Sequence, residues 1–202
     1  MKKRRLLPVF FWEYKMNDFI KKFLTNDFQS EYSHDNRIDL IDDRRFFYMD
    51  CSGFVYWCLE QSGYKRALVE VRAFLRKHNF IKINRLFCKD FAFIHEHADD
   101  FKYWQFTNQP TENCILVVVF PDGNGHCMFV DKIMRCDMDS FQMRVIDSTR
   151  YPHQNDSRGK NETGVGIGEI AIKKAGEKYI YDSKNIEIPP RVADIYFVTP
   201  KR

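Results

Sequence analysis

Hydrophobic and polar residues follow a helical period through the first part of the chain. Apolar side chains recur every three or four residues in three segments, which are predicted to be helices: 11–27, 52–63 and 65–78. The second helix is expected to end at Gly63, because glycine is the residue type that most often follows a helix. Residues 28–47 are polar and lack a regular period, so an irregular segment is predicted there. Residues 79–113 have no clear period, and a short helix with loops is expected.

The second half of the chain has the pattern of β-strands. Residues 114–120 are a continuous apolar run, as expected for a strand that is covered on both faces. A segment rich in turn-forming residues follows at 121–125. Further strands are predicted at 126–133, 141–148, 169–173, 178–182 and 194–199, with a polar, glycine-containing segment at 149–168. A helical half followed by a strand-rich half indicates an α+β fold.

The strands at 126–133 and 141–148 are close enough in sequence to form a hairpin. A turn at Cys136-Asp137 would place His126 directly opposite Asp147. The same register predicts three further pairs: Lys132 with Phe141, Val130 with Met143, and Met128 with Val145. The face shared by His126 and Asp147 is otherwise apolar, so we expect it to pack on a helix. A buried carboxylate needs a partner, and an opposed His126 would be within hydrogen-bonding reach of Asp147.

Cys51 lies at the predicted start of the second helix, where Asp50 or Ser52 can cap the first turn. Unpaired amides and the positive end of the helix dipole stabilise a thiolate at such a position. The same amides can hold the oxyanion of a tetrahedral intermediate. A buried structural thiol, as expected for Cys58, is the alternative interpretation. Together, Cys51, His126 and Asp147 have the chemistry of a nucleophile, its base and the residue that orients the base.

The segment 50–55, with the sequence Asp-Cys-Ser-Gly-Phe-Val, resembles the D-C-S-G-[FL]-[VT] motif of the NlpC/P60 superfamily of papain-like cysteine hydrolases. Gly125-His126, followed by an apolar strand, is similar to the second motif of that family. The family's third catalytic residue is a polar side chain on the next strand, which corresponds to Asp147. The resemblance covers roughly 48–63 and 114–148. It implies a papain-like α+β fold in which the nucleophile helix packs on an antiparallel β-sheet.

Two departures from the family pattern leave the substrate class open. The usual Pro-Gly-Asp before the central strand is replaced by Pro110-Thr111-Glu112-Asn113. The spacing from Cys51 to His126 is long, so 64–113 is a candidate insertion. The resemblance therefore predicts a single NlpC/P60-like domain over 1–202, with 1–47 as an N-terminal helical extension.

The expected function is hydrolysis of a peptide or isopeptide-like amide through a thioester acyl-enzyme, and the resemblance implies peptidoglycan-type peptides as substrates. Two alternatives remain open: an acyltransferase, transglutaminase-like enzyme or deamidase using the same three residues, and a catalytically inactive binding module. The candidate substrate contacts lie beside Cys51 and in the polar segment after Asp147. They are Tyr48, Ser52, Arg150 and His153.

Composition excludes several other classes. The chain has 202 residues, of which 44% are hydrophobic, so it can form a core of ordinary size. The net charge is only +4 and the basic residues are dispersed, which argues against a nucleic-acid partner. No stretch approaches the roughly 20 apolar residues of a membrane span, and the basic N-terminus lacks a small-residue cleavage site. Six cysteines favour a reducing cytoplasm, although export without a cleaved signal peptide would look the same.

The sequence predicts no metal and no organic cofactor. Its cysteines form no CxxC pair, so a cysteine-rich zinc site is not expected. His95-Glu96-His97 with Asp99 and Asp100 lacks a third ligand placed by spacing, and a solvated polar stretch is the preferred interpretation. The alternating glycines in 164–168 do not match a nucleotide-binding loop.

Overall fold

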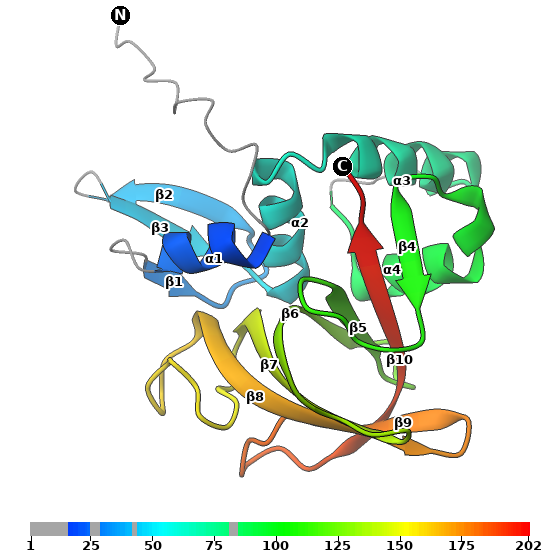
Figure 1. The fold of residues 1–202 in the computed structure, drawn as a ribbon. Coiled ribbons are helices and arrows are strands. Elements are labelled where there is room, and N and C mark those ends of the chain that lie inside the picture. The colour runs from blue at the N-terminus through cyan, green and yellow to red at the C-terminus, as the bar shows by residue number, and fades with distance from the viewer. Residues whose placement is uncertain (1–15, 25–28, 42–43, 81–84) are drawn as a thin grey trace, which may run out of the picture.

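The computed structural model describes residues 16–24, 29–41, 44–80 and 85–202 (Figure 1). Its first part comprises α1 (Met16–Leu24), β1 (Gln29–Glu31), β2 (Arg37–Ile41), β3 (Arg44–Tyr48), α2 (Cys51–Gln61), α3 (Lys65–Lys77), α4 (Cys88–Glu96) and the 3-10 helix η1 (Ala98–Asp100). The rest forms β4 (Trp104–Thr107), β5 (Ile115–Val119), β6 (Gly125–Cys136), β7 (Ser140–Thr149), β8 (Gly164–Ala175), β9 (Lys178–Asp182) and β10 (Arg191–Pro200). The fold is therefore α+β, as predicted.

The larger sheet closes into a six-stranded antiparallel barrel. Its strand order is β4-β10-β5-β6-β7-β8-β9, and β10 also pairs with β9. Closure is possible because β10 is long: Arg191–Ala193 pair with β9, whereas Asp194–Val198 pair with β5. β4 pairs with Phe197–Pro200 of β10 and is not one of the six strands of the barrel. The barrel interior is filled by apolar side chains, among them Leu116, Met128, Val130, Phe141, Met143, Val145 and Phe197.

The helices and a small three-stranded sheet lie together on one side of the barrel (Figure 1). The side chains of α2 pack against the outward-facing residues of β6 and β7, including Cys127, Phe129 and Ile146. The rings of Phe54 and Phe129 meet edge to face, with centroids 6.1 Å apart. The small sheet has the order β1-β3-β2, with β1 parallel and β2 antiparallel to β3.

The helix prediction was largely confirmed, but one segment was wrong. The helices predicted at 52–63 and 65–78 are α2 and α3, and Gly63 follows α2 with a φ of +83°. Within the predicted helix 11–27, residues 16–24 are helical, and 11–15 and 25–27 lie outside the described residues. Residues 29–41 and 44–47 are not irregular, because most of them belong to the three strands of the small sheet. These strands are short and mostly exposed, so they show no clear period.

The predicted hairpin forms, but in a different register. Val130 pairs with Val145 rather than Met143, and the turn lies at 137–140. The turn is centred two residues further along the chain than predicted, and two register shifts in β6, one between Val130 and Lys132 and one between Ile133 and Arg135, offset part of that displacement. Near His126 the pairing is thus displaced by two residues, which preserves the face on which each side chain lies.

The hairpin face that carries His126 and Asp147 was predicted to pack on a helix, but it does not. Met128, Val130, Met143 and Val145 point into the barrel, whereas α2 covers the opposite face. The physical reason is that both faces of β6 and β7 are buried, so neither can be identified as the helix-packed one by hydrophobicity alone.

Three strands also differ from the prediction in extent. β8 begins at Gly164, well before the expected 169, and β10 spans 191–200 rather than 194–199. β4 lies in the stretch where only a short helix and loops were expected. None of the helices in the described part of the chain combines the length and apolar character that a membrane span requires.

Candidate active site

Cys51 is the first residue of α2, and Asp50 caps that helix. The Asp50 carboxylate accepts hydrogen bonds from the Gly53 amide at 2.8 Å and from the Ser52 hydroxyl at 3.0 Å. Arg85 pairs with the same carboxylate. The Cys51 side chain, 6% exposed, is thereby held at the positive end of the helix dipole. Cys51 therefore lies at a helix start, as expected.

The glycine after Ser52 is required by a close approach of the small sheet. A Cβ at Gly53 would lie 1.6 Å from Oδ1 of Asn36. Asn36, in the turn between β1 and β2, accepts a hydrogen bond from the Asp50 amide at 3.3 Å. Its φ of +50° lies in the left-handed region that asparagine tolerates. The β1–β2 turn therefore rests directly on the first turn of α2.

His126 lies next to the start of β6 and joins Cys51 to Asp147. Its Nε2 is 2.5 Å from Oδ2 of Asp147, and the imidazole also hydrogen-bonds to the Cys51 sulfur. The Ser148 hydroxyl donates to the Met49 carbonyl at 2.6 Å and so ties β7 to the segment that leads into α2. The three residues predicted to act together are therefore adjacent, although His126 and Asp147 are not directly opposed.

Asp147 is fully buried and is surrounded by cationic donors. Oδ2 faces Nε2 of His153 at 2.9 Å, and Oδ1 accepts a hydrogen bond from Arg158 at 3.0 Å. Burial alone would raise the pKa of Asp147, but the charges of His153 and Arg158 and the hydrogen bonds from both histidines hold it well below its usual value. The carboxylate is thus ionised and keeps His126 oriented.

His153 and Arg158 reach Asp147 because the segment after β7 folds back onto β8. A Cβ at Gly166 would lie 2.5 Å from Nε of Arg158, and one at Gly168 would lie 2.6 Å from Cβ of His153. The alternating glycines leave room for this segment. Sequence reasoning did not identify Arg158 as a site residue, because only the packing of the segment on β8 brings it to Asp147.

Cys51 and His126 form a charged pair. Hydrogen bonds from the Cys127 and Cys88 thiols, together with the charge of His126, lower the pKa of Cys51 well below its ordinary value despite burial. Burial would lower the pKa of His126, but the Cys51 charge and the hydrogen bond to Asp147 raise it to about 10. A thiolate and an imidazolium therefore coexist at neutral pH.

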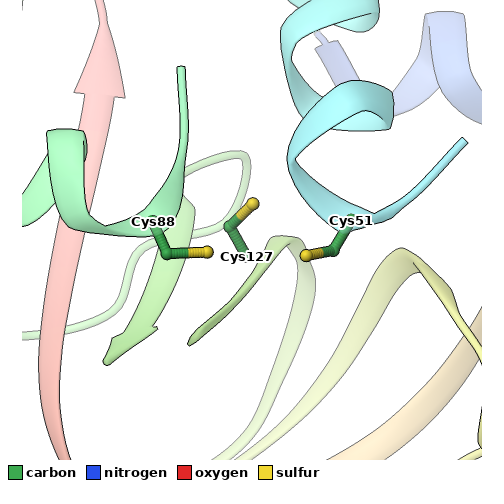
Figure 2. Close-up of side chains that lie close together, drawn as sticks. All are labelled: Cys51, Cys88 and Cys127. Atoms are coloured by element: carbon green, nitrogen blue, oxygen red, sulfur yellow. The ribbon is translucent and has the colours of Figure 1, made fainter. Parts of the chain in front are cut away.

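Three cysteine sulfurs lie together at the site. The Sγ atoms of Cys51, Cys88 and Cys127 are all within 4.8 Å of one another (Figure 2). Cys88 is the first residue of α4, and Cys127 follows His126 on β6. The cluster could not be seen in the sequence, because its members lie on three elements far apart along the chain.

A second group, His126, Asp147 and His153, also has its ligand atoms within 4.8 Å. Its chemistry fits a hydrogen-bond network better than a metal site. Arg158 already places a positive charge on Asp147, and Nδ1 of His153 faces the Ser183 carbonyl at 3.1 Å. Both His153 nitrogens face oxygen atoms of the protein, so neither points toward an open coordination position.

His95 and His97 belong to neither group of potential metal ligands found among the described residues. The two side chains pack separately. The ring of His95 lies 4.9 Å from that of Tyr196, and the ring of His97 lies 4.8 Å from that of Phe93. Both histidines are half-buried among aromatic rings rather than solvated, which differs from the expectation.

The four predicted substrate contacts have other neighbours. Ser52 is buried and bonds to Asp50, while His153 is buried against Asp147. The Arg37 guanidinium lies over the ring of Tyr48, 4.1 Å from the ring centroid. Arg150 is exposed, and its guanidinium lies 5.6 Å from the ring centroid of Tyr32.

Tyr32 is a neighbour of Cys51 that the sequence did not indicate. Burial and the negative charges of Cys51 and Asp50 raise the pKa of Tyr32 far above its ordinary value. Its phenol therefore stays protonated at neutral pH. Since Tyr32 follows β1 directly, the small sheet contributes to the site.

The fold and the site define an α+β protein in which a six-stranded barrel and a helix start bring Cys51, His126 and Asp147 together. Comparison with protein-family models, with curated proteins and with solved structures finds no match to this chain.

Proposed function

We propose that the protein is a cysteine-dependent hydrolase that cleaves an amide bond through a thioester acyl-enzyme. The observation that carries the proposal is the chain of contacts from Cys51, at a helix N-terminus, through His126 to the buried carboxylate of Asp147. The NlpC/P60 resemblance implies a nucleophile helix packed on an antiparallel β-sheet, and the packing of α2 on β6 and β7 supports our proposal of a papain-like relationship.

The first half of the proposed reaction forms the acyl-enzyme. The Cys51 thiolate attacks the carbonyl carbon of the substrate, and the carbonyl oxygen becomes an oxyanion. The Cys51 amide, at the start of α2, and the Tyr32 phenol are the donors we assign to that oxyanion. The His126 imidazolium then protonates the leaving amine as the C–N bond breaks, which leaves a thioester on Cys51.

The second half returns the enzyme to its starting state. His126, now neutral, takes a proton from a water molecule that attacks the thioester carbonyl. The C–S bond breaks, and the carboxylic acid leaves while Cys51 regains its thiolate. Asp147 orients the imidazole and stabilises its charged form in both halves.

The substrate we propose is a peptide or isopeptide-like amide, with peptidoglycan-type peptides as the class the resemblance implies. Access to the site is narrow, since the side chains of Cys51 and His126 are only 6% and 14% exposed. All six cysteines are free thiols, which fits a reducing compartment, and we propose the cytoplasm.

A generic acyl donor tests the nucleophile without knowledge of the natural substrate. Reduced protein is incubated with p-nitrophenyl acetate, and release of nitrophenol and acetylation of Cys51 are followed by absorbance and mass spectrometry. Cys51→Ala should lower the rate by roughly 10³-fold or more, because the nucleophile is lost. Cys136→Ser, which alters an exposed thiol, is the matched control and should leave the rate unchanged.

Unchanged nitrophenol release by Cys51→Ala, with folding confirmed by circular dichroism, would remove Cys51 from the mechanism. Adding glycine methyl ester to the same assay distinguishes hydrolysis from acyl transfer. Acetate is the expected product, whereas an acetylated amine would identify an acyltransferase.

A further inference from the structure

We propose that Cys51, Cys88 and Cys127 form a binding site for one thiophilic divalent metal ion, with zinc as the physiological occupant, and that this ion silences the nucleophile. The binding site stands on its own geometry. Its regulatory consequence rests on the proposed hydrolase function.

The three sulfurs converge from separate elements onto one point. Cys51 and Cys88 point toward each other from the starts of α2 and α4, and Cys127 lies between them on β6 (Figure 2). All three Sγ atoms lie within 4.8 Å of one another. Zinc–sulfur bonds of about 2.3 Å in a tetrahedral site correspond to sulfur–sulfur distances of about 3.8 Å. Closing the cluster around an ion therefore needs only small side-chain movements.

The positive ends of two helices face this cluster of sulfurs. Two helices, α2 and α4, direct their positive ends at the cluster, because Cys51 and Cys88 are their first residues. A divalent cation bound between the three sulfurs would displace the thiol protons and neutralise most of the added charge.

Gly125 gives Cys88 the room to approach. A Cβ at this position would lie 2.6 Å from Cβ of Cys88 and 2.6 Å from the Val118 carbonyl oxygen. The proposed hydrolysis does not use Cys88 or Cys127 as a reacting group. Cys58 and Cys114, in contrast, are buried singly, and burial alone raises the pKa of Cys58. A close cluster of three thiols therefore needs an explanation that isolated buried thiols do not.

The ion would compete with catalysis for the same atom. Coordination uses the lone pair with which Cys51 would attack a carbonyl carbon. Metal binding would thus remove the nucleophile, and removal of the ion would restore it.

Cadmium titration of the reduced full chain tests the binding site directly. We expect thiolate-to-metal charge-transfer absorption that saturates at one cadmium ion per chain and is displaced by zinc. Cys88→Ser and Cys127→Ser should each weaken binding by more than the roughly 10–100-fold that loss of a residue behind a ligand costs. Cys114→Ser, another buried thiol outside the cluster, should bind cadmium as the wild type does. No saturable absorption, or unchanged binding in both cluster variants, would overturn the proposal.

A second measurement uses only the wild-type protein, so it does not depend on the folding of the variants. Zinc should protect Cys51 from alkylation by iodoacetamide, and EDTA should restore labelling, as read by peptide mass spectrometry. Equal labelling with zinc and with EDTA would contradict the site. The two proposals can fail separately. Cadmium binding without Cys51 acetylation would refute only the hydrolase, whereas acetylation that is insensitive to zinc would refute only the metal site.

Discussion

A single buried carboxylate, that of Asp147, holds three basic side chains at the candidate site. His126, His153 and Arg158 all contact it, at 2.5, 2.9 and 3.0 Å. Removing one partner from a buried charged network typically lowers the free energy of unfolding by about 3–5 kcal/mol, because the remaining charge is left buried without an opposite charge beside it. The arrangement keeps His126 protonated beside a thiolate, so Cys51 is reactive at a pH where ordinary thiols are not.

The alkylation of Cys51 should depend only weakly on pH between 7 and 9. Its pKa lies well below the ordinary value, so its thiolate is already formed at pH 7. An ordinary thiol, with a pKa of about 8.5, is about 3% ionised at pH 7 and becomes roughly 20-fold more reactive by pH 9. Iodoacetamide labelling of Cys51 and of the exposed Cys136 in the same sample provides the comparison. Parallel profiles for the two thiols would contradict the charged pair.

The charged pair of Cys51 and His126 also predicts the pH above which catalysis should decline. His126, with its pKa raised to about 10, must be protonated to release the leaving amine, so amide cleavage should fall as pH rises through about 10. Asp147→Asn removes the negative charge that helps to raise this pKa. It should move the upper limb of the profile to lower pH, and an unmoved limb would contradict the assigned role of Asp147.

At the scale of elements, the β1–β2 turn sets the position of α2, the helix that begins at Cys51. Asn36 accepts from the Asp50 amide and occupies the space that a Gly53 side chain would fill. The charges of Cys51 and Asp50 raise the pKa of Tyr32, which directly follows β1. The small sheet is therefore part of the site, even though the sequence suggested only an irregular segment there.

Gly53→Ala should destabilise the protein because Asn36 must leave its place. We expect a loss of about 1–3 kcal/mol in the free energy of unfolding, measured with urea. In an Asn36→Gly background the clash is absent and the left-handed turn is retained. There the same substitution should be neutral or slightly stabilising, since alanine favours a helix over glycine by about 1 kcal/mol. Equal effects in the two backgrounds would show that Asn36 is not the contact that matters.

At the scale of the whole molecule, the sheet separates two cores. One fills the barrel, and the other lies between the sheet and the helices. Phe129 and Phe141 are a matched pair across this division, because each is buried and meets a second phenylalanine nearly edge to face. Only the core that contains Phe129 also contains Cys51.

Phe129→Leu and Phe141→Leu should therefore differ in function more than in stability. Each should cost about 1–2 kcal/mol in unfolding free energy, through lost aromatic contact and altered packing. Phe129→Leu should also slow acetylation of Cys51, because Phe129 supports α2, whereas Phe141→Leu should leave it nearly unchanged. Urea unfolding and the nitrophenyl acetate assay measure the two effects. Equal loss of acetylation in both variants would mean that the barrel core positions the nucleophile as well.

Features that depend on residues close together in the sequence could be predicted from the sequence alone. Local patterns were enough for the α+β class, for α2 with Cys51 at its start, and for the hairpin that brings His126 close to Asp147. Helix periods, caps and hairpin pairing act over a few residues, so their physical causes are visible in short segments. The exact register could not be predicted, because the position of the turn and two local shifts in β6 together set it, without changing which side chains share a face near His126.

Other features arise only when distant segments pack. Barrel closure through β10, the approach of Arg158 to Asp147, and the meeting of Cys51, Cys88 and Cys127 each join residues that no local pattern relates. Their positions depend on the summed packing of two cores and on glycines that allow close approach, such as Gly53 and Gly125. Long-range contacts of this kind are set by the free energy of the whole fold, which short sequence patterns do not contain.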